Sequence, residues 1–182
     1  MMFDRKIKLN QGLTLIELMV IIALISITLL VAVPSFSGFF AKQKLRGLGG
    51  ELFFLSKLAR AEAAKQGSET YIVFNGSGTS WCVGLSEDQA DCDCTTANSC
   101  AVDDIERVIS SSDFKDVSFD SNTFPDGKIT ISPYKGRSSF DGIATFSITV
   151  DGVSKNLSLE RSIMGRDRIC SPSGNSLRYP AC

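Results

Sequence analysis

The side chains available for chemistry in this 182-residue chain are acids, arginines, lysines and six cysteines, because the sequence contains no histidine. Without histidine the chain cannot build a Ser-His-Asp relay, a Cys-His nucleophile pair, a histidine-bearing zinc site or a haem proximal ligand. The run Gly76-Ser77-Gly78 lacks the lysine of a phosphate-binding P-loop. We therefore predict that the protein is not an enzyme and has no cofactor, no metal and no small-molecule substrate.

Six cysteines fall into a group of four and a pair near the end of the sequence. The group consists of Cys82, Cys92, Cys94 and Cys100. These four allow three disulfide pairings, of which we favour Cys82–Cys92 with Cys94–Cys100. A zinc site is disfavoured, because the chain has no pair of CxxC knuckles and exported thiols oxidise. Cys170 and Cys182 bracket the tail, and we expect a disulfide between them that contributes roughly 3 kcal/mol.

Charge is unevenly distributed, although 19 basic and 20 acidic residues nearly cancel. Residues 1–65 carry nine basic and four acidic side chains, residues 66–127 carry two and twelve, and residues 128–182 carry eight and four. A net charge near zero argues against a general polyanion binder. One cluster lacks calcium-loop spacing and is interpreted as a solvated acidic loop. It contains Glu87, Asp88, Asp91 and Asp93.

An apolar run from Leu13 to Val33 is the clearest element signal in the sequence. As a helix it is about 31 Å long, which matches the hydrocarbon core of a bilayer. The basic residues before it predict that most of the chain faces outward across the membrane. They are Arg5, Lys6 and Lys8. Glu17 lies inside the run, where a carboxylate costs up to about 3 kcal/mol, so we expect it to meet a positively charged partner.

The string from Gly12 through Glu17, with its short basic leader, resembles the class III signal of type IV prepilins and pseudopilins. The resemblance implies that a prepilin peptidase cuts between Gly12 and Leu13 and methylates the new N-terminus. It also implies that Glu17 pairs with the N-terminal amine of a neighbouring subunit during assembly. Many family members have phenylalanine where this chain has Leu13. Two alternatives are a secretory signal cleaved near Val33 and an anchor that is never cut.

Beyond Pro34, leucines at three- and four-residue steps predict a second amphipathic stretch of helix that ends near Gly67. They are Leu45, Leu48, Leu52 and Leu55, and the stripe continues with Leu58 or Ala59. The glycines at positions 47, 49 and 50 predict a weakened section. After Gly67 the period changes to two. Strands are expected at 70–75, 80–85, 105–110, 117–120, 128–132, 144–150, 154–159 and 162–170, with a hairpin turn at Asp151-Gly152.

These elements predict an α+β protein in which a long N-terminal helix packs on an antiparallel β-sandwich head. The expected parts are a leader at 1–12, the long helix at 13–66 with a transmembrane half at 13–33, and a disulfide-bonded head at 67–182. This layout resembles the GspH/FimT-type pilins, whose heads have two antiparallel sheets packed over the helix. The tail resembles that of FimU-like minor pilins, which carry a closing disulfide.

Residues 164–170 contain a Gly-Arg-x-Arg pattern. In the FimT branch of the family this run is associated with DNA binding during natural transformation. Arg166 and Arg168 are expected on one face of the last strand, where both can contact phosphates. The other cations expected to join this patch are Lys155, Arg161 and Arg178. Asp167 and the acidic middle of the chain argue against DNA binding.

The resemblance thus implies a minor pilin that primes type IV pilus assembly and sits at or near the filament tip. Its partners would be other minor and major pilins, the prepilin peptidase and the inner membrane, with DNA as an alternative. Before assembly it would be a single-pass protein of the bacterial inner membrane with a periplasmic head, and afterwards part of the extracellular pilus. The alternatives are a DNA-uptake pilin and a minor pseudopilin of type II secretion.

Overall fold

The computed structural model describes residues 13–182 except 88–91, 173 and 175–176, and only the backbone of residues 30–35. Gly12 and the rest of the expected leader, residues 1–12, lie outside the described residues. The chain divides into two compact units, residues 1–37 and residues 38–182. Helix α1 (Leu15–Gln66) contributes to both of them.

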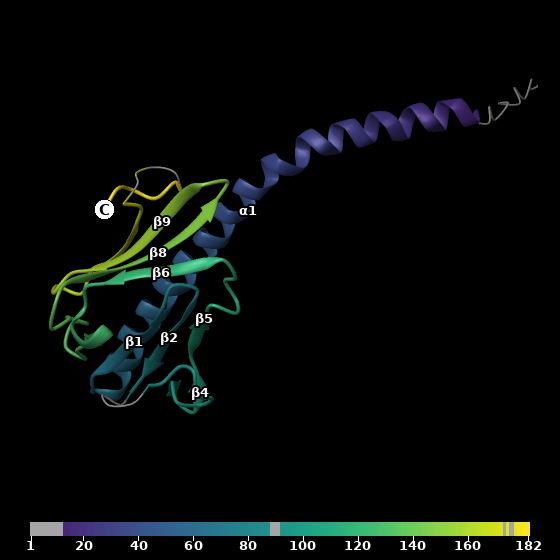
Figure 1. Ribbon diagram of the computed structural model, residues 1–182. Helices are drawn as coiled ribbons and strands as arrows, with labels where there is room; N and C mark the ends of the chain where they lie inside the picture. The colour runs from purple at the N-terminus through teal and green to yellow at the C-terminus, as the bar shows by residue number, and fades with distance from the viewer. Residues whose placement is uncertain (1–12, 88–91, 173, 175–176) are drawn as a thin grey trace, which may run out of the picture. The chain divides into compact units, whose positions relative to one another are not determined.

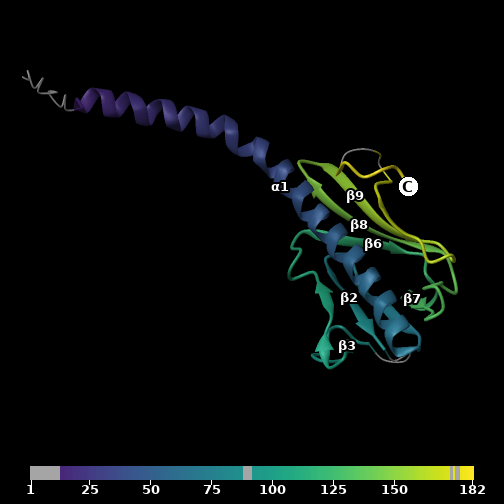
Figure 2. The ribbon, with the colours of Figure 1, turned by 180° about the vertical axis from the view of Figure 1, so that it is seen from behind.

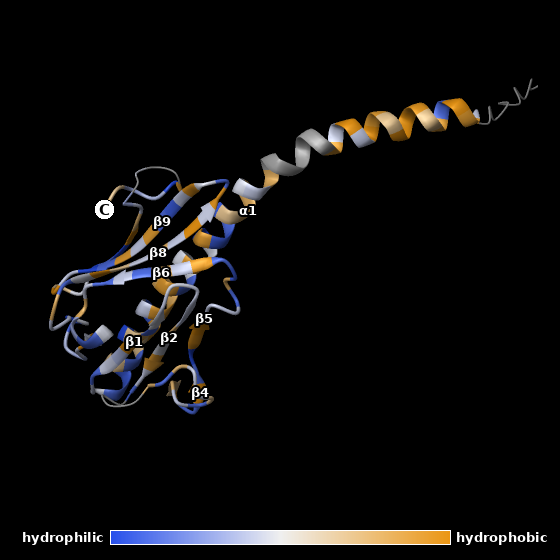
Figure 3. Ribbon diagram, in the orientation of Figure 1, coloured by the Kyte–Doolittle hydropathy of each residue, from blue (hydrophilic) through white to orange (hydrophobic). Residues whose placement is uncertain are grey.

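The first unit contains the beginning of α1. Apolar side chains between Leu13 and Leu29 are exposed all around this part of the helix, and Figure 3 shows hydrophobic colours dominating there. A helix that is apolar all round needs an apolar environment or partner helices to cover it.

The second unit contains two four-stranded antiparallel sheets and a small two-stranded one (Figure 1). The first sheet has the order β5 (Val108–Ser110), β2 (Ser80–Ser86), β1 (Thr70–Ser77), β7 (Lys128–Ile131). The second has the order β10 (Asp167–Cys170), β9 (Val153–Arg161), β8 (Gly142–Val150), β6 (Val117–Asn122). The small sheet pairs β3 (Ala101–Val102) with β4 (Ile105–Glu106), and a 3-10 turn, η1 (Pro125–Gly127), precedes β7.

Within this unit, residues 38–66 of α1 lie across the inner face of the sheets (Figure 2). The leucines from Leu45 to Leu55 in the stripe are buried there, and Leu45, Leu48 and Leu52 are at most 1% exposed. The stripe ends with Ala59, which is 0% exposed, whereas Leu58 is partly buried. Trp81 on β2 links the two sheets, because its Nε1 donates to the Val117 carbonyl at 2.8 Å and its ring packs edge-on against Phe146. The α+β fold class predicted from the sequence is confirmed.

The glycines at positions 47, 49 and 50 were expected to weaken α1, but the helix runs through all three without a break. A Cβ at Gly49 would lie 3.0 Å from Leu157, 3.2 Å from Tyr179 and 3.3 Å from Ile169. The missing side chain therefore lets the helix approach sheet β10-β9-β8-β6 closely. The helical cost of glycine is offset by this packing.

The predicted hairpin at Asp151-Gly152 is confirmed, since Val150 pairs with Val153 and both turn residues have positive φ. The prediction of one strand over 162–170 is wrong for its first half. Residues 162–166 form a turn in which the Gly165 N–H donates to the Ser162 carbonyl at 2.8 Å. Gly165 has a φ of 76°, which extended backbone does not allow, so β10 begins only at Asp167.

Candidate functional site

The start of α1 is capped by Thr14. The Glu17 N–H donates to Thr14 Oγ1 at 3.3 Å, and the Leu18 N–H donates to the Thr14 carbonyl at 3.2 Å. Threonine followed three residues later by glutamate is the pattern of a capping box. Glu17 also stands in the first turn, where the helix dipole favours a negative charge. These contacts define where the helix begins, two residues after the described chain starts at Leu13.

Glu17 is exposed, as are the apolar side chains around it. The carboxylate is therefore accessible to a partner molecule. Among the residues that the structure describes, no helix is both long enough and apolar enough to qualify as a membrane span. The side chains of residues 30–33, which end the expected span 13–33, lie outside the description.

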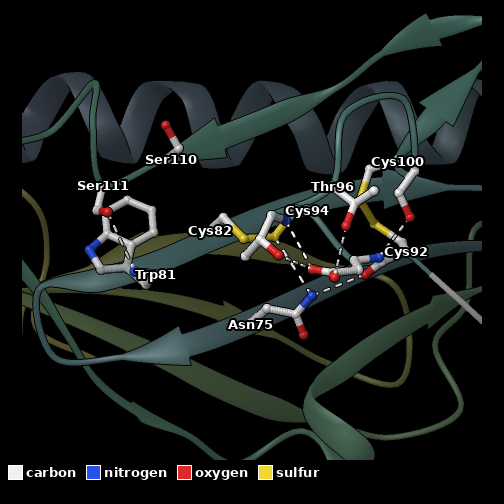
Figure 4. Close-up of a disulfide and its surroundings, with 12 residues drawn as sticks. Asn75, Trp81, Cys82, Cys92, Cys94, Thr96, Cys100, Ser110 and Ser111 are labelled. Carbon is white, nitrogen blue, oxygen red and sulfur yellow. Dashed lines mark hydrogen bonds between the residues drawn. A yellow bond between two sulfur atoms is a disulfide. The ribbon is translucent and has the colours of Figure 1, made fainter.

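Two disulfides lie over the outer face of sheet β5-β2-β1-β7 (Figure 4). Cys82 is bonded to Cys94, and Cys92 is bonded to Cys100. The favoured pairing of Cys82 with Cys92 and of Cys94 with Cys100 is therefore wrong. The two bonds interleave along the sequence instead of following one another.

The pairing follows from how the loop is held against β1 and β2. Asn75, which pairs with Cys82 across the two strands, donates from Nδ2 to the Cys92 carbonyl at 3.0 Å. The sulfurs of Cys92 and Cys100 then lie over Gly84, where an added Cβ would be 2.5 Å from each. Gly84 is two residues beyond Cys82 on the same face of β2, so Cys94 is left to bond Cys82. Of the acidic cluster in this loop, Asp88 and Asp91 lie outside the described residues.

A third disulfide joins Cys170, the last residue of β10, to Cys182. The tail also makes a backbone contact here, because the Ser171 N–H donates to the Pro180 carbonyl at 2.9 Å. Arg46 of α1 donates from Nε to the Leu177 carbonyl at 2.9 Å. The tail is thus attached covalently to a strand and by a hydrogen bond to the helix.

Arg166 and Arg168 are in different environments. Arg166 is exposed and belongs to the turn before β10, whereas Arg168 is on the strand. Arg168 donates from Nε and Nη2 to one oxygen of Glu160, at 3.0 and 2.6 Å. The charge of Arg168 is therefore balanced on the protein itself, and Arg166 is the arginine of this motif that is presented to solvent.

Arg161 does not join a surface patch, which corrects that expectation. Its side chain is 0% exposed and donates from Nη1 to Asp167 Oδ1 at 2.5 Å and to Ser56 Oγ at 3.0 Å, and from Nη2 to the Gly136 carbonyl at 2.8 Å. Burial lowers the pKa of Arg161 from its usual value, and the charge of Asp167 opposes that shift. We call Arg161, Asp167, Ser56 and Gly136 the buried arginine cluster.

We missed this cluster when reading the sequence, although one signal for it exists. Arg161 continues the inward alternation of Leu157 and Leu159 on β9, and Asp167 lies two residues before the inward-facing Ile169 on β10. Opposite charges at two inward positions of neighbouring strands predict a buried ion pair. The cluster joins α1, the loop after β7, β9 and β10, so its role in the geometry is to hold the helix against the sheet.

A capped apolar helix that continues into a head of two antiparallel sheets defines a pilin-type subunit. Residues 51–164 match the family described as Type II transport protein GspH, and residues 7–33 match the prokaryotic N-terminal methylation motif. Because the first match covers more than half of the sequence, the chain belongs to the GspH family, and it is a pilin or pseudopilin of the GspH/FimT kind. Searches found no similar curated protein and no similar solved structure.

Membership has direct consequences for processing and assembly. The methylation motif marks subunits that are anchored in a membrane, processed by a prepilin peptidase and then assembled with other pilins. Members of the family are structural, non-enzymatic subunits.

Proposed function

We propose that the chain is a minor pilin that primes assembly of a type IV pilus and sits at or near the filament tip. It acts as a structural subunit and catalyses no reaction. The observation that carries this proposal is the methylation motif at 7–33 followed, through one continuous helix, by the GspH domain at 51–164. The inner membrane holds the subunit before assembly, with its head in the periplasm, and the extracellular pilus holds it afterwards.

In this function the prepilin peptidase cuts between Gly12 and Leu13. Glu17 then binds the methylated amine of a neighbouring subunit. The exposure of Glu17 on the capped first turn supports this role. An isolated carboxylate and an isolated amine are each costly in lipid, and contact between them offsets both costs.

The test compares the wild-type chain with Glu17→Ala and Glu17→Gln in cells. Mass spectrometry of the N-terminal peptide should show methylated Leu13 in all three proteins. Fractionation should show that the two variants remain in the membrane and are depleted from sheared filaments. A peptide that starts after Val33, or normal incorporation of both variants, contradicts the proposal.

A pilus is favoured over type II secretion by the tail. The Cys170–Cys182 bond resembles the closing disulfide of FimU-like minor pilins. Deletion of the gene should abolish piliation and twitching motility while leaving secretion of enzymes intact. Loss of secretion with normal twitching would assign the chain to the type II secretion pseudopilins instead.

DNA uptake is the second candidate function, and the exposure of Arg166 favours it. Its test is binding of labelled DNA by the full-length protein in detergent over a salt series. A DNA-uptake pilin should bind at low salt and lose affinity in Arg166→Gln, with Lys115→Gln on another exposed segment as the control. The paired state of Arg168 predicts that Arg168→Gln changes binding less than Arg166→Gln does.

A further inference from the structure

Two loops on the head touch each other and together expose apolar and basic side chains. One loop follows β7 and the other is the turn before β10. The Ser138 N–H donates to the Ile163 carbonyl at 3.2 Å, and a Cβ at Gly165 would collide with the Gly136 carbonyl. We call six of their exposed residues the basic loop patch; the loop after β7 also exposes Phe140 and Asp141. The patch contains Tyr134, Lys135, Arg137, Ile163, Met164 and Arg166.

The apolar members of this patch are unusually exposed for their size. Tyr134 and Met164 are each 71% exposed, and Ile163 is 47% exposed. Exposed aromatic and methionine side chains bordered by arginine are typical of protein interfaces. The patch is also held in shape, because the buried Arg161 donates to the carbonyl of Gly136 inside one of its loops.

A second surface of the same head has complementary properties. The hairpin of β3 and β4 presents Asp103, Asp104 and Glu106 around Ile105, whose side chain is 51% exposed. We call these four residues the acidic hairpin. Its turn is fixed to α1 by an ion pair between Lys65 and Asp103, and the Asp103 N–H donates to Glu87 at 2.9 Å.

The two surfaces lie at opposite edges of one sheet. The basic loop patch follows β7, which is one edge of the order β5-β2-β1-β7. The acidic hairpin precedes β5, the other edge, and the Leu85 N–H of β2 donates to the Arg107 carbonyl just after the hairpin, at 3.0 Å. Figure 2 shows β3 and β7 on opposite sides of β2, and Figure 1 shows β4 below β5. One molecule therefore cannot bring its own two surfaces together without unfolding the sheet.

We propose that the basic loop patch of one copy binds the acidic hairpin of a second copy. Three cations around an apolar centre then meet the carboxylates of Asp104 and Glu106 beside an exposed isoleucine, because the charge of Asp103 is already balanced by Lys65. Because the two surfaces differ and lie at opposite edges, the contact is heterologous and adds copies in a row. The proposal goes beyond the proposed function, which requires no contact between two copies of this chain.

A second copy fits the patch better than a nucleic acid does. Ile163 and Met164 have no ring on which a base can stack, and the rings that the same two loops expose are those of Tyr134 and Phe140. Arg168, the other arginine of the motif, is already bound to Glu160. A few free cations make only a few phosphate contacts.

The experiment uses full-length protein in detergent, mixed from equal amounts of unlabelled and ¹⁵N-labelled chains. A zero-length carbodiimide cross-linker joins amines to carboxylates in contact. We expect mass spectrometry to find Lys135 linked to Asp104 or Glu106 in peptides of mixed isotope composition. Absence of that mixed cross-link would overturn the proposal.

Charge reversal separates this contact from association through the helices. In the variant Arg137→Glu with Arg166→Glu, the mixed cross-link of Lys135 should fall at least tenfold, and Lys115→Glu should leave it unchanged. A second variant, Asp104→Asn with Glu106→Lys, has an altered hairpin and an intact basic loop patch. When it is mixed with the patch variant, whose acidic hairpin is intact, a cross-link should return between Lys135 of the second variant and the acidic hairpin of the patch variant. A cross-link that survives the patch variant, or one that competing single-stranded DNA removes, would contradict the proposal. Neither result bears on processing at Gly12 or on Glu17, which the filament experiment tests separately.

Discussion

Arg161 and Asp167 form an ion pair in the interior of the head, with 2.5 Å between Arg161 Nη1 and Asp167 Oδ1 and neither side chain exposed. The pair is extended by Ser56 of α1 and by Lys57, whose Nζ lies 3.7 Å from Asp167 Oδ2. Buried ion pairs are sensitive to the loss of one partner, because the remaining charge stays in a low-dielectric environment. The first prediction follows from this asymmetry.

Replacing only one member of the pair should destabilise the head severely. Arg161→Met leaves the carboxylate of Asp167 buried with Lys57 as its remaining cation, and should lower the free energy of unfolding by about 3–5 kcal/mol. Denaturant unfolding followed by the fluorescence of Trp81 measures the change.

The control removes both charges together. Arg161→Met combined with Asp167→Leu should recover most of the loss, because no uncompensated charge remains. A double variant that is destabilised by the sum of the two single losses would show that the two side chains act independently.

The Arg168–Glu160 pair has similar chemistry on the outer face of the same two strands, with side chains 39% and 41% exposed. Solvent screens this pair, so Arg168→Gln should cost less than about 1 kcal/mol of unfolding free energy. Adding 1 M salt should reduce the difference between this variant and the wild type. A loss as large as that of Arg161→Met would mean that exposure does not distinguish the two pairs.

Gly84→Ala should prevent the Cys92–Cys100 bond from forming in its present position. The added methyl group would lie 2.5 Å from both sulfurs, and the strand backbone beneath them cannot move away without breaking the sheet. We expect free thiols in this variant, measured by thiol titration and by peptide mapping. Gly50→Ala is the matched control, because nothing lies within 4 Å of its Cβ, and it should stabilise the helix by up to about 1 kcal/mol.

Glu51 should make the stability of the head depend on pH. Partial burial and the neighbouring Asp113 raise its pKa above the usual 4.5. The folded state therefore holds this proton more tightly than the unfolded state, so the contribution of Glu51 to stability is most favourable below pH 4.5 and falls as pH rises through the raised pKa. Glu51→Gln should be the more stable protein at pH 7, by at most about 0.5 kcal/mol because the group is largely exposed.

The measurement compares the thermal unfolding of wild type and Glu51→Gln between pH 4 and pH 8. Their difference should shrink toward zero at the acidic end of the series. A difference that grows on acidification would mean that the carboxylate is stabilised by its surroundings.

Local patterns in the sequence were sufficient to predict the helix, the hairpin at Asp151-Gly152 and the fold class. The leucine stripe and the strand alternation each depend on residues within a few positions of one another. The methylation motif is also local, since it lies within residues 7–33. These are the features for which neighbouring residues decide the conformation.

The buried arginine cluster and the four-cysteine pairing depend on contacts that no local pattern contains. Arg161 reaches Ser56 across 105 positions of sequence, so its burial follows from helix packing and not from its neighbours. Cys82 bonds to Cys94 and not to Cys92 because Asn75 contacts the loop and because the other disulfide occupies the space above Gly84. Arginine and aspartate in a strand are usually solvent-exposed, which is why the Gly-Arg-x-Arg run predicts a surface strand here.

The interleaved cysteine bonds also bear on how the head matures. Synthesis proceeds from the N-terminus, so Cys82 and Cys92 become available before Cys94 and Cys100. An oxidant that joins thiols in order of emergence makes the non-native Cys82–Cys92 bond first. That bond must then be broken by thiol–disulfide exchange, which requires a free thiolate and takes about minutes to hours without an isomerase. We therefore expect the yield of correctly bonded head in the cell to depend on disulfide isomerase activity as well as on oxidising power.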